Sequence, residues 1–310
     1  MPRIPSQITR PIFYIYPTQD DALNNTEFGA TGFFYGVGTG FENRAHYYAV
    51  TNAHVVFRDD MENPVIRVNT TDKKYDVIVT SRDNWKRHPD GDDIAVCPIR
   101  IAPENMDATC FTKEVIADET FLKDYSIGIG DDVFMIGRFR VHAGREKNLP
   151  VIRFGIIAAM NEEGIYNEAT QVYQESYLVE MRSISGFSGS PVFVYVNPYS
   201  SPRDAVGASL KIEGNLAEGI KATIEVKVLG IQWGQISYKA IATDDSGQKY
   251  KVNVDSAMEG VVPIQKLRDL IYSEEMIEMR KKLDEKNKNN RTNEKGEEST
   301  VTITTYENGI

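Results

Sequence analysis

Residues 185–191 read Ser-Gly-Phe-Ser-Gly-Ser-Pro, a serine in a glycine-flanked turn that ends in proline. It stands between two apolar runs, 176–181 and 191–196, which both have the composition of β-strands. Glycines on either side of a serine let the backbone turn sharply and expose the hydroxyl. Gly186 would also allow an N–H group to face a developing oxyanion. The stretch therefore predicts a nucleophilic serine at Ser188.

Two further stretches supply the partners that such a serine needs. Residues 51–54 read Thr-Asn-Ala-His after a strand-like run, and residues 92–96 read Asp-Asp-Ile-Ala-Val. Nucleophilic attack by a hydroxyl needs a base and a third group that holds the base in one tautomer. We assign His54 as the base and Asp93, which opens an apolar run, as the orienting acid. Asp92 is the alternative acid, but neighbouring side chains of a strand face opposite ways, so only one of the two can reach His54.

Composition limits the remaining classes of function. The 310 residues, 41% of them hydrophobic, can bury a sizeable core, and a net charge of −10 argues against a nucleic-acid binder. No apolar run approaches the roughly 20 residues that span a bilayer, and the start of the chain lacks the apolar segment of a secretion signal. We therefore expect a cytoplasmic protein without membrane contact.

Cys97 and Cys110 stand in unlike surroundings, and no phosphate-binding loop or metal-ligand spacing is present, so neither a cofactor nor a metal is expected.

Short β-prone runs separated by turn residues occupy most of the chain and predict an all-β antiparallel sandwich or barrel. Helical periodicity is confined to residues 263–283, and the polar composition of residues 287–299 predicts disorder. The polar stretch 198–218 is predicted to be an insertion, either a surface loop or a lid near the nucleophile. The expected strands are 11–16, 29–35, 46–51, 65–69, 74–80, 93–99, 132–137, 151–158, 191–196, 220–229 and 231–237, with 250–254 a weaker candidate.

Taken together, residues 51–55, 93–96 and 186–191 resemble the three signature motifs of the chymotrypsin/trypsin-like serine peptidases. They are most similar to the bacterial trypsin-like group that includes the HtrA/Deg proteases. The chain order His, Asp, Ser is that of chymotrypsin. Residues 128–137 are similar to the strand before the second-barrel core of that group, and residues 231–234 resemble the strand that pairs with the substrate backbone. The resemblance covers most of the chain.

The resemblance implies a chymotrypsin-like double six-stranded antiparallel β-barrel with a C-terminal helix. The peptidase domain would occupy residues 1–272, with barrels at roughly 10–115 and 120–262 and a docking helix from residue 263. Residues 273–310 would form a charged helical extension and a disordered tail.

The resemblance also implies a serine endopeptidase that works without a cofactor on protein or peptide substrates. Ser188 would be the nucleophile, and the backbone N–H groups of Gly186 and Ser188 would form the oxyanion hole. Arg182 falls where the floor of the primary specificity pocket lies in many relatives, and a cation there would favour an acidic side chain. The remaining substrate-binding candidates are Gln232, Trp233 and Gly234.

The chain also departs from this family in ways that keep a second hypothesis open. No Ile-Val-Gly-Gly-type N-terminus appears, so control would come from loop ordering or from a regulatory protein bound to the C-terminal extension. No room remains for the PDZ domain of the HtrA proteases. Ser190 replaces a common glycine, and Arg138-Phe139 replaces an aromatic residue followed by proline. The alternative function is a latent or inactive protease-like module that binds or senses a partner.

Overall fold

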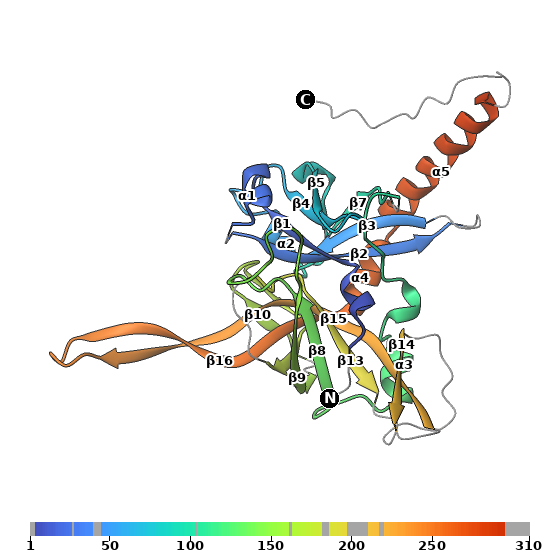
Figure 1. Ribbon diagram of the computed structural model, residues 1–310. Helices are drawn as coiled ribbons and strands as arrows, with labels where there is room; N and C mark the ends of the chain where they lie inside the picture. The colour runs from blue at the N-terminus through green and yellow to red at the C-terminus, as the bar shows by residue number, and fades with distance from the viewer. Residues whose placement is uncertain are drawn as a thin grey trace. The chain divides into compact units, whose positions relative to one another are not determined.

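The computed structural model describes residues 4–26, 28–39, 45–102, 104–160, 163–181, 186–196, 210–216 and 220–294 (Figure 1). Within these ranges the side chains of residues 210–225 and 286–294 are not described. The candidate pocket residue Arg182 and most of the predicted insertion 198–218 therefore lie outside the described residues.

The first of two large antiparallel sheets is built from the N-terminal third of the chain. Its strand order is β5-β4-β1-β2-β3-β7-β6. The strands are β1 (Ile12–Tyr16), β2 (Ala30–Gly38), β3 (Ala45–Thr51), β4 (Val65–Asn69), β5 (Tyr75–Val79), β6 (Lys86–Arg87) and β7 (Ala95–Ile99). Strands β2 and β3 form a hairpin, as the glycine-rich link between them predicts.

The second sheet follows in sequence and is closed by a pairing between two of its strands. Its order is β13-β8-β9-β12-β16-β15-β14, and β13 also pairs with β15. The strands are β8 (Asp132–Gly137), β9 (Val151–Met160), β12 (Tyr177–Glu180), β13 (Pro191–Val196), β14 (Leu210–Leu216), β15 (Ile220–Thr243) and β16 (Lys249–Pro263). A separate two-stranded sheet contains β10 (Ile165–Asn167) and β11 (Val172–Gln174). These two large sheets are the expected barrels, with seven strands each where six were predicted.

Each barrel has its own hydrophobic core. Phe13, Phe34 and Ile66 belong to the first core, and Met135, Val179 and Leu229 belong to the second. Burying one such side chain contributes about 1.5–3 kcal/mol. A chain of aromatic contacts joins the barrels, since ring centroids lie 5.6 Å apart for Phe33–Phe111, 5.5 Å for Phe111–Phe193 and 4.9 Å for Phe134–Phe193.

The sequence of strand β1 is continuously apolar, rather than alternating, because both faces of the strand are buried. Phe13 and Ile15 pack into the first core, whereas Tyr14 and Tyr16 pack on the opposite face with Ala143. Both faces are therefore covered, and all five residues of β1 are buried.

Two sequence predictions need correction in the second barrel, and a third is confirmed as part of a longer strand. Residues 210–216, predicted to be loop, form β14, because they pair with residues 220–226 of β15. The two strands predicted at 220–229 and 231–237 are one strand, β15, that continues to Thr243. The weak candidate at 250–254 lies in β16, which pairs with β15 out to Thr243↔Lys249. Figure 1 shows the far part of this β15–β16 hairpin projecting beyond the barrel.

Helical segments are short except near the end of the chain. The α-helices are α1 (Gln19–Asn24), α2 (Ala53–Val56), α3 (Glu119–Asp124), α4 (Ile264–Ile271) and α5 (Glu274–Glu294), and the 3-10 helices are η1 (Ser6–Thr9), η2 (Arg82–Asn84) and η3 (Lys113–Val115). The helix predicted at 263–283 is interrupted between α4 and α5. The predicted disorder of residues 287–299 is wrong as far as residue 294, where the backbone is helical; residues 295–299 lie outside the described range.

The chain divides into two compact units, Met1–Leu270 and Ile271–Ile310. Within the second unit, an Arg280 N–H group donates to the Ile271 carbonyl at 2.7 Å. No helix within the described ranges is both long and apolar enough to cross a bilayer. Both cysteines are free, and burial raises the pKa of the Cys97 thiol to about 12, so this thiol is unreactive at neutral pH.

Candidate active site

His54 lies in α2, directly after β3, and its ring meets the carboxylate of Asp93. The ring Nδ1 is 2.6 Å from Asp93 Oδ2, and the backbone N–H of His54 donates to Asp93 Oδ1 at 2.8 Å. The Asp93 side chain is fully buried, whereas 20% of the His54 side chain is exposed. Because a carboxylate only accepts hydrogen bonds, this contact assigns the ring hydrogen to Nδ1 and leaves Nε2 able to accept a proton.

The small β10–β11 hairpin, which connects β9 and β12 of the second barrel, also holds Asp93. Asn167 donates from Nδ2 to Asp93 Oδ2 at 3.1 Å, and the Asp93 N–H donates to Gln174 Oε1 at 2.9 Å. Asn52 of the first barrel donates to the Asp93 carbonyl at 2.8 Å. All three amide residues are buried. Sequence reasoning missed Asn167 and Gln174, because they stand in a polar stretch that carries no motif.

The turn around Ser188 has the backbone that its glycines predict. Gly186 and Gly189 both have positive φ, 111° and 87°. A Cβ at Gly189 would lie 2.1 Å from the Thr31 carbonyl oxygen, so only glycine fits there. Thr31 binds the turn by donating its N–H to the Ser188 carbonyl at 2.9 Å and its hydroxyl to the Gly186 carbonyl at 2.7 Å. A strand of the first barrel therefore fixes the serine turn of the second.

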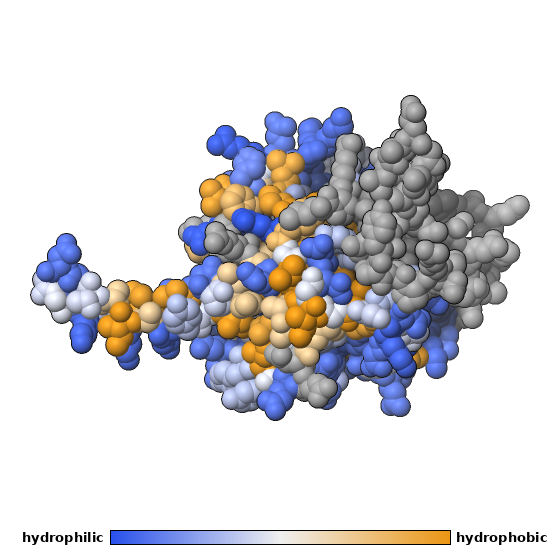
Figure 2. Space-filling model, turned by 90° about the horizontal axis from the view of Figure 1, so that it is seen from below, coloured by the Kyte–Doolittle hydropathy of each residue, from blue (hydrophilic) through white to orange (hydrophobic). Residues whose placement is uncertain are grey.

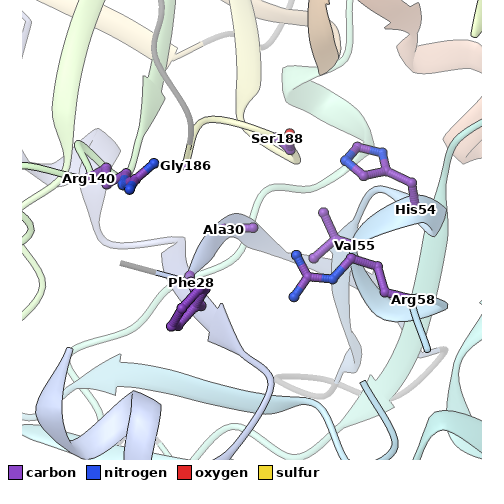
Figure 3. Close-up of a pocket in the computed structure, with 9 residues that line it drawn as sticks. Phe28, Ala30, His54, Val55, Arg58, Arg140, Gly186 and Ser188 are labelled. Carbon is purple, nitrogen blue, oxygen red and sulfur yellow. The ribbon is translucent and has the colours of Figure 1, made fainter. Parts of the chain in front are cut away.

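A cavity of about 180 Å³ brings the turn and the histidine together (Figure 3). Its lining residues are Phe28, Gly29, Ala30, His54, Val55, Arg58, Arg140, Gly186 and Ser188. In Figure 3 the ring of His54 points toward the side of the cavity where Ser188 lies. Arg58 and Arg140 are the two charged residues of the lining, and the guanidinium of Arg58 is held by Asp60 through contacts of 2.9 Å. Neither arginine was identified from the sequence.

A second cavity, of about 500 Å³, also reaches His54. It is lined by Ala53, His54, Phe57, Arg58, Arg87, His88, Gly91, Asp92, Ala169, Thr170 and Val172. His54 and Arg58 line both cavities, so the imidazole can be reached from two sides.

Asp92, the alternative orienting acid, makes contacts of its own. Its Oδ2 lies 3.1 Å from His88 Nδ1 and 3.4 Å from Lys266 Nζ of α4. This agrees with the expectation that only one of two adjacent carboxylates can reach His54. Among the described residues, His88, Asp90 and Asp92 could place ligand atoms within 4.8 Å of one another around a metal ion. The ammonium of Lys266 already supplies a positive charge to Asp92, so the chemistry of this donor set does not favour a cation.

The predicted substrate-binding residues of β15 are placed differently from one another. The Gln232 side chain is buried and donates to Glu259 Oε2 at 2.8 Å. The Trp233 indole is buried and donates to Ser176 Oγ at 3.0 Å. Gly234 lies in an open position, since a Cβ there would meet no atom within 4 Å. A role in substrate binding remains a prediction for all three, and for the first two it would involve the backbone.

These features agree with the comparison against known protein families. The sequence signature described as "Trypsin-like peptidase domain" matches residues 30–195, which is more than half of the chain. The chain therefore belongs to the trypsin-like peptidase family, whose members include serine proteases. No curated protein matches the sequence.

The chain also aligns with solved structures of very low sequence identity. The MamO protease domain from Magnetospirillum magneticum aligns with a TM-score of 0.50 and 14% identity over 86% of this chain and 99% of that chain. The HtrA-type protease AlgW aligns with a TM-score of 0.41 and 13% identity over 88% of this chain and 66% of that chain. Human heparin binding protein aligns with a TM-score of 0.44 and 9% identity over 87% and 93% of the two chains. The MamO alignment supports the chymotrypsin-like double-barrel fold.

The contact between Asn167 and Asp93 predicts a measurable effect on the reactivity of Ser188. In Asn167→Ala the carboxylate loses a buried donor, and a hydrogen bond to a charged group contributes about 1.5–3 kcal/mol. We expect the rate constant for fluorophosphonate labelling of Ser188 to fall about tenfold. Tyr166→Phe, which removes an exposed hydroxyl from the same hairpin, is the matched control and should label like the wild type. Equal rates in all three proteins would contradict this role of Asn167.

The buried pair of His88 and Asp92 predicts how stability varies with pH. Burial lowers the pKa of His88 from its usual 6.5, and Lys266 lowers it further, although Asp92, Asp90 and Asp269 act to raise it. The unfolded chain thus takes up a proton that the folded protein does not. The stability contributed by neutral His88 is present above pH 6.5 and is lost as the pH falls toward the lowered value. Urea unfolding at pH 7, 6 and 5 should therefore show a smaller loss of stability for His88→Gln than for the wild type. A parallel loss in both proteins would refute the prediction.

Proposed function

We propose that this chain is a serine endopeptidase that uses Ser188, His54 and Asp93 as a catalytic triad. The observation that carries the proposal is the double contact of Asp93 with His54, on a ring that shares a cavity with Ser188 and Gly186. This is the arrangement that activation of a hydroxyl requires: an oriented base beside an exposed nucleophile.

In the proposed reaction, Ser188 Oγ forms a bond to the carbonyl carbon of the substrate while its proton passes to His54 Nε2. The negative charge on the former carbonyl oxygen is received by the N–H groups of Gly186 and Ser188. His54 then gives the proton to the leaving amine as the C–N bond breaks, and water repeats the sequence to release the acyl group. Loss of one oxyanion donor typically lowers the rate about 10²–10³-fold.

An oxyanion hole formed at rest is part of the proposal, and the positive φ of Gly186 is compatible with it. Only glycine adopts such a φ at little cost, and the Gly186 carbonyl is already engaged by the Thr31 hydroxyl. The alternative function, a latent protease-like module that binds or senses a partner, differs from the proposal in one respect. In that case the triad would be assembled but Ser188 would not react.

Labelling with a fluorophosphonate probe separates the two functions. We expect the wild type to become labelled at one site and Ser188→Ala to remain unlabelled, because the probe bonds to an activated serine oxygen. Mass spectrometry of the labelled peptide identifies the residue. If the wild type remains unlabelled at every pH between 6 and 9, the latent module is favoured.

Exchanging the orienting acid tests the role of Asp93 within the triad. Asp93→Asn would favour the wrong histidine tautomer, and we expect peptide cleavage to fall about 10⁴-fold while the fold is retained. Asp92→Asn is the matched control at the adjacent position and should retain most activity. Cleavage that survives in Asp93→Asn and fails in Asp92→Asn would assign the role to Asp92.

We also propose a preference for acidic side chains near the cleaved bond. Arg182 motivates this preference from the sequence, and Arg58 and Arg140 support it, since they are the charged residues lining the cavity beside Ser188. A guanidinium pairs with a carboxylate through charge-assisted hydrogen bonds.

A peptide library with every residue type on both sides of the scissile bond tests this preference. We expect enrichment of Asp and Glu at one or more positions, and Arg140→Gln should reduce the enrichment at the position nearest that residue. Cleavage governed by Lys, Arg or large apolar residues would refute the preference. A regulatory partner for residues 273–310 and a cytoplasmic location remain predictions.

A further inference from the structure

The far part of the β15–β16 hairpin is a long two-stranded ribbon, residues 235–255, which we name the arm. Its register runs from Ser237↔Asp255 to Thr243↔Lys249. Hydrogen bonds stabilise the turn at the tip, where the Asp244 carboxylate accepts from the Ser246 N–H, the Gln248 N–H and the Tyr250 hydroxyl. Figure 1 shows the arm leaving the second barrel as a direct continuation of both strands. The arm is therefore an ordered element rather than an irregular loop.

One face of the arm is apolar along its whole length. Residues directly opposite each other share a face, and so do residues two apart on one strand. One face of the arm is therefore apolar and consists of the pairs Tyr238↔Val254, Ala240↔Val252 and Ala242↔Tyr250. The opposite face is mostly polar and consists of the pairs Ser237↔Asp255, Lys239↔Asn253, Ile241↔Lys251 and Thr243↔Lys249.

This apolar face is exposed to solvent in the isolated chain. Tyr238 is 56% exposed, Tyr250 45% and Val252 37%. Figure 2 shows apolar and polar residues side by side along the projecting arm. An isolated two-stranded ribbon is marginally stable in water, and a contiguous exposed apolar surface marks an interaction site.

The arm also offers a free strand edge that leads to the candidate nucleophile. Beside the Ser188 turn, β15 is bonded to the turn itself: Gly189 N–H donates to the Gln232 carbonyl, and Gln232 N–H donates to the Ser190 carbonyl, both at 2.9 Å. From Gly234 to Thr243, β15 pairs with β16 on one edge, and no other strand of the described chain pairs with its second edge. The unpaired edge thus begins where Ser188 is held and continues to the tip.

The dimensions of the arm indicate whether it binds one extended segment or the surface of a folded protein. Nine residues of β15 at about 3.4 Å per residue span about 30 Å, and two strands are about 10 Å wide, so one face offers about 300 Å². A stable interface between folded proteins needs about 800 Å² from each partner. The arm alone is too small for that, but it matches one extended segment, which can add its backbone to a strand edge and place alternate side chains on the apolar face.

We propose that the arm binds the extended, unfolded part of a polypeptide substrate next to the bond that Ser188 cleaves. The segment adds to the free edge of β15 from Gly234 outward, and its alternate apolar side chains extend the apolar face that Tyr238, Tyr250 and Val252 form. This inference rests on the proposed function, and it assigns the substrate class: unstructured polypeptides with alternating apolar residues, rather than short peptides or folded proteins.

An arm-shortened variant tests the proposal. Ser237 and Asp255 are joined by Asn-Gly, a two-residue turn suited to an antiparallel hairpin. The substrate is reduced and carboxymethylated lactalbumin, which is unfolded. We expect kcat/KM for its cleavage to fall about tenfold or more, whereas fluorophosphonate labelling of Ser188 and cleavage of four-residue peptides keep the wild-type rate.

Paired point variants test the face that carries the binding. Tyr238→Thr with Val252→Thr removes the apolar surface and keeps high strand propensity, and should weaken cleavage of the unfolded protein about as much as shortening the arm. Lys239→Thr with Lys251→Thr alters the opposite face and is the matched control. Equal kcat/KM in all of these proteins would overturn the proposal.

Binding measured without catalysis separates this inference from the proposed function. In a Ser188→Ala background, fluorescence anisotropy of labelled carboxymethylated lactalbumin should report affinity that falls about tenfold when the arm is shortened. If Ser188 proves unreactive but this arm-dependent binding persists, the proposed function fails, while the assignment of unfolded polypeptide to the arm stands. If shortening the arm instead converts a dimer to a monomer by light scattering, or abolishes binding to anionic phospholipid vesicles, with lactalbumin binding unchanged, a second copy or a membrane is the occupant and the inference is overturned.

Discussion

The position of the candidate nucleophile depends on one buried residue of the other barrel, Thr31. Its N–H and hydroxyl bind the carbonyls of Ser188 and Gly186, its own carbonyl accepts from the Thr51 hydroxyl, and its hydroxyl accepts from the Arg138 N–H. Each of these bonds contributes about 1 kcal/mol net, but leaving a buried partner unsatisfied costs about 1–3 kcal/mol. The loop that carries Ser188 is therefore held by the first barrel as well as by its own.

The acid of the proposed triad is likewise held by both barrels. Asp93 belongs to the first barrel and orients His54 there, yet its carboxylate and its N–H also bind Asn167 and Gln174 of the second. A buried carboxylate is stable only if hydrogen bonds replace its lost hydration. Each barrel thus holds a candidate catalytic residue of the other, and the candidate site exists only where the two meet.

The amino-acid sequence predicts the parts of this arrangement that depend on local chemistry. Glycines around Ser188, the histidine after a strand and the aspartate before an apolar run need only neighbouring residues to be recognised. Asn167 and Gln174 escape prediction because their role depends on a contact across the two barrels, which no local pattern records. The arm and β14 are not predicted in full for a different reason. Both are stabilised by strand pairing, and their sequences contain many polar residues. Their sequences therefore show little of the apolar pattern that marks a core strand.

The bonds between the Ser188 turn and Gln232 also constrain when the site can assemble. Gly189 and Ser190 precede Gln232 in the chain, and β13 can close the second barrel only by pairing with β15. A chain still being synthesised has both His54 and Ser188 before it has the strand that holds the turn in place. Because such non-local pairings form late in folding, the nascent chain passes through synthesis without an assembled nucleophile. The topology thus delays assembly of the candidate site until β15 has been synthesised.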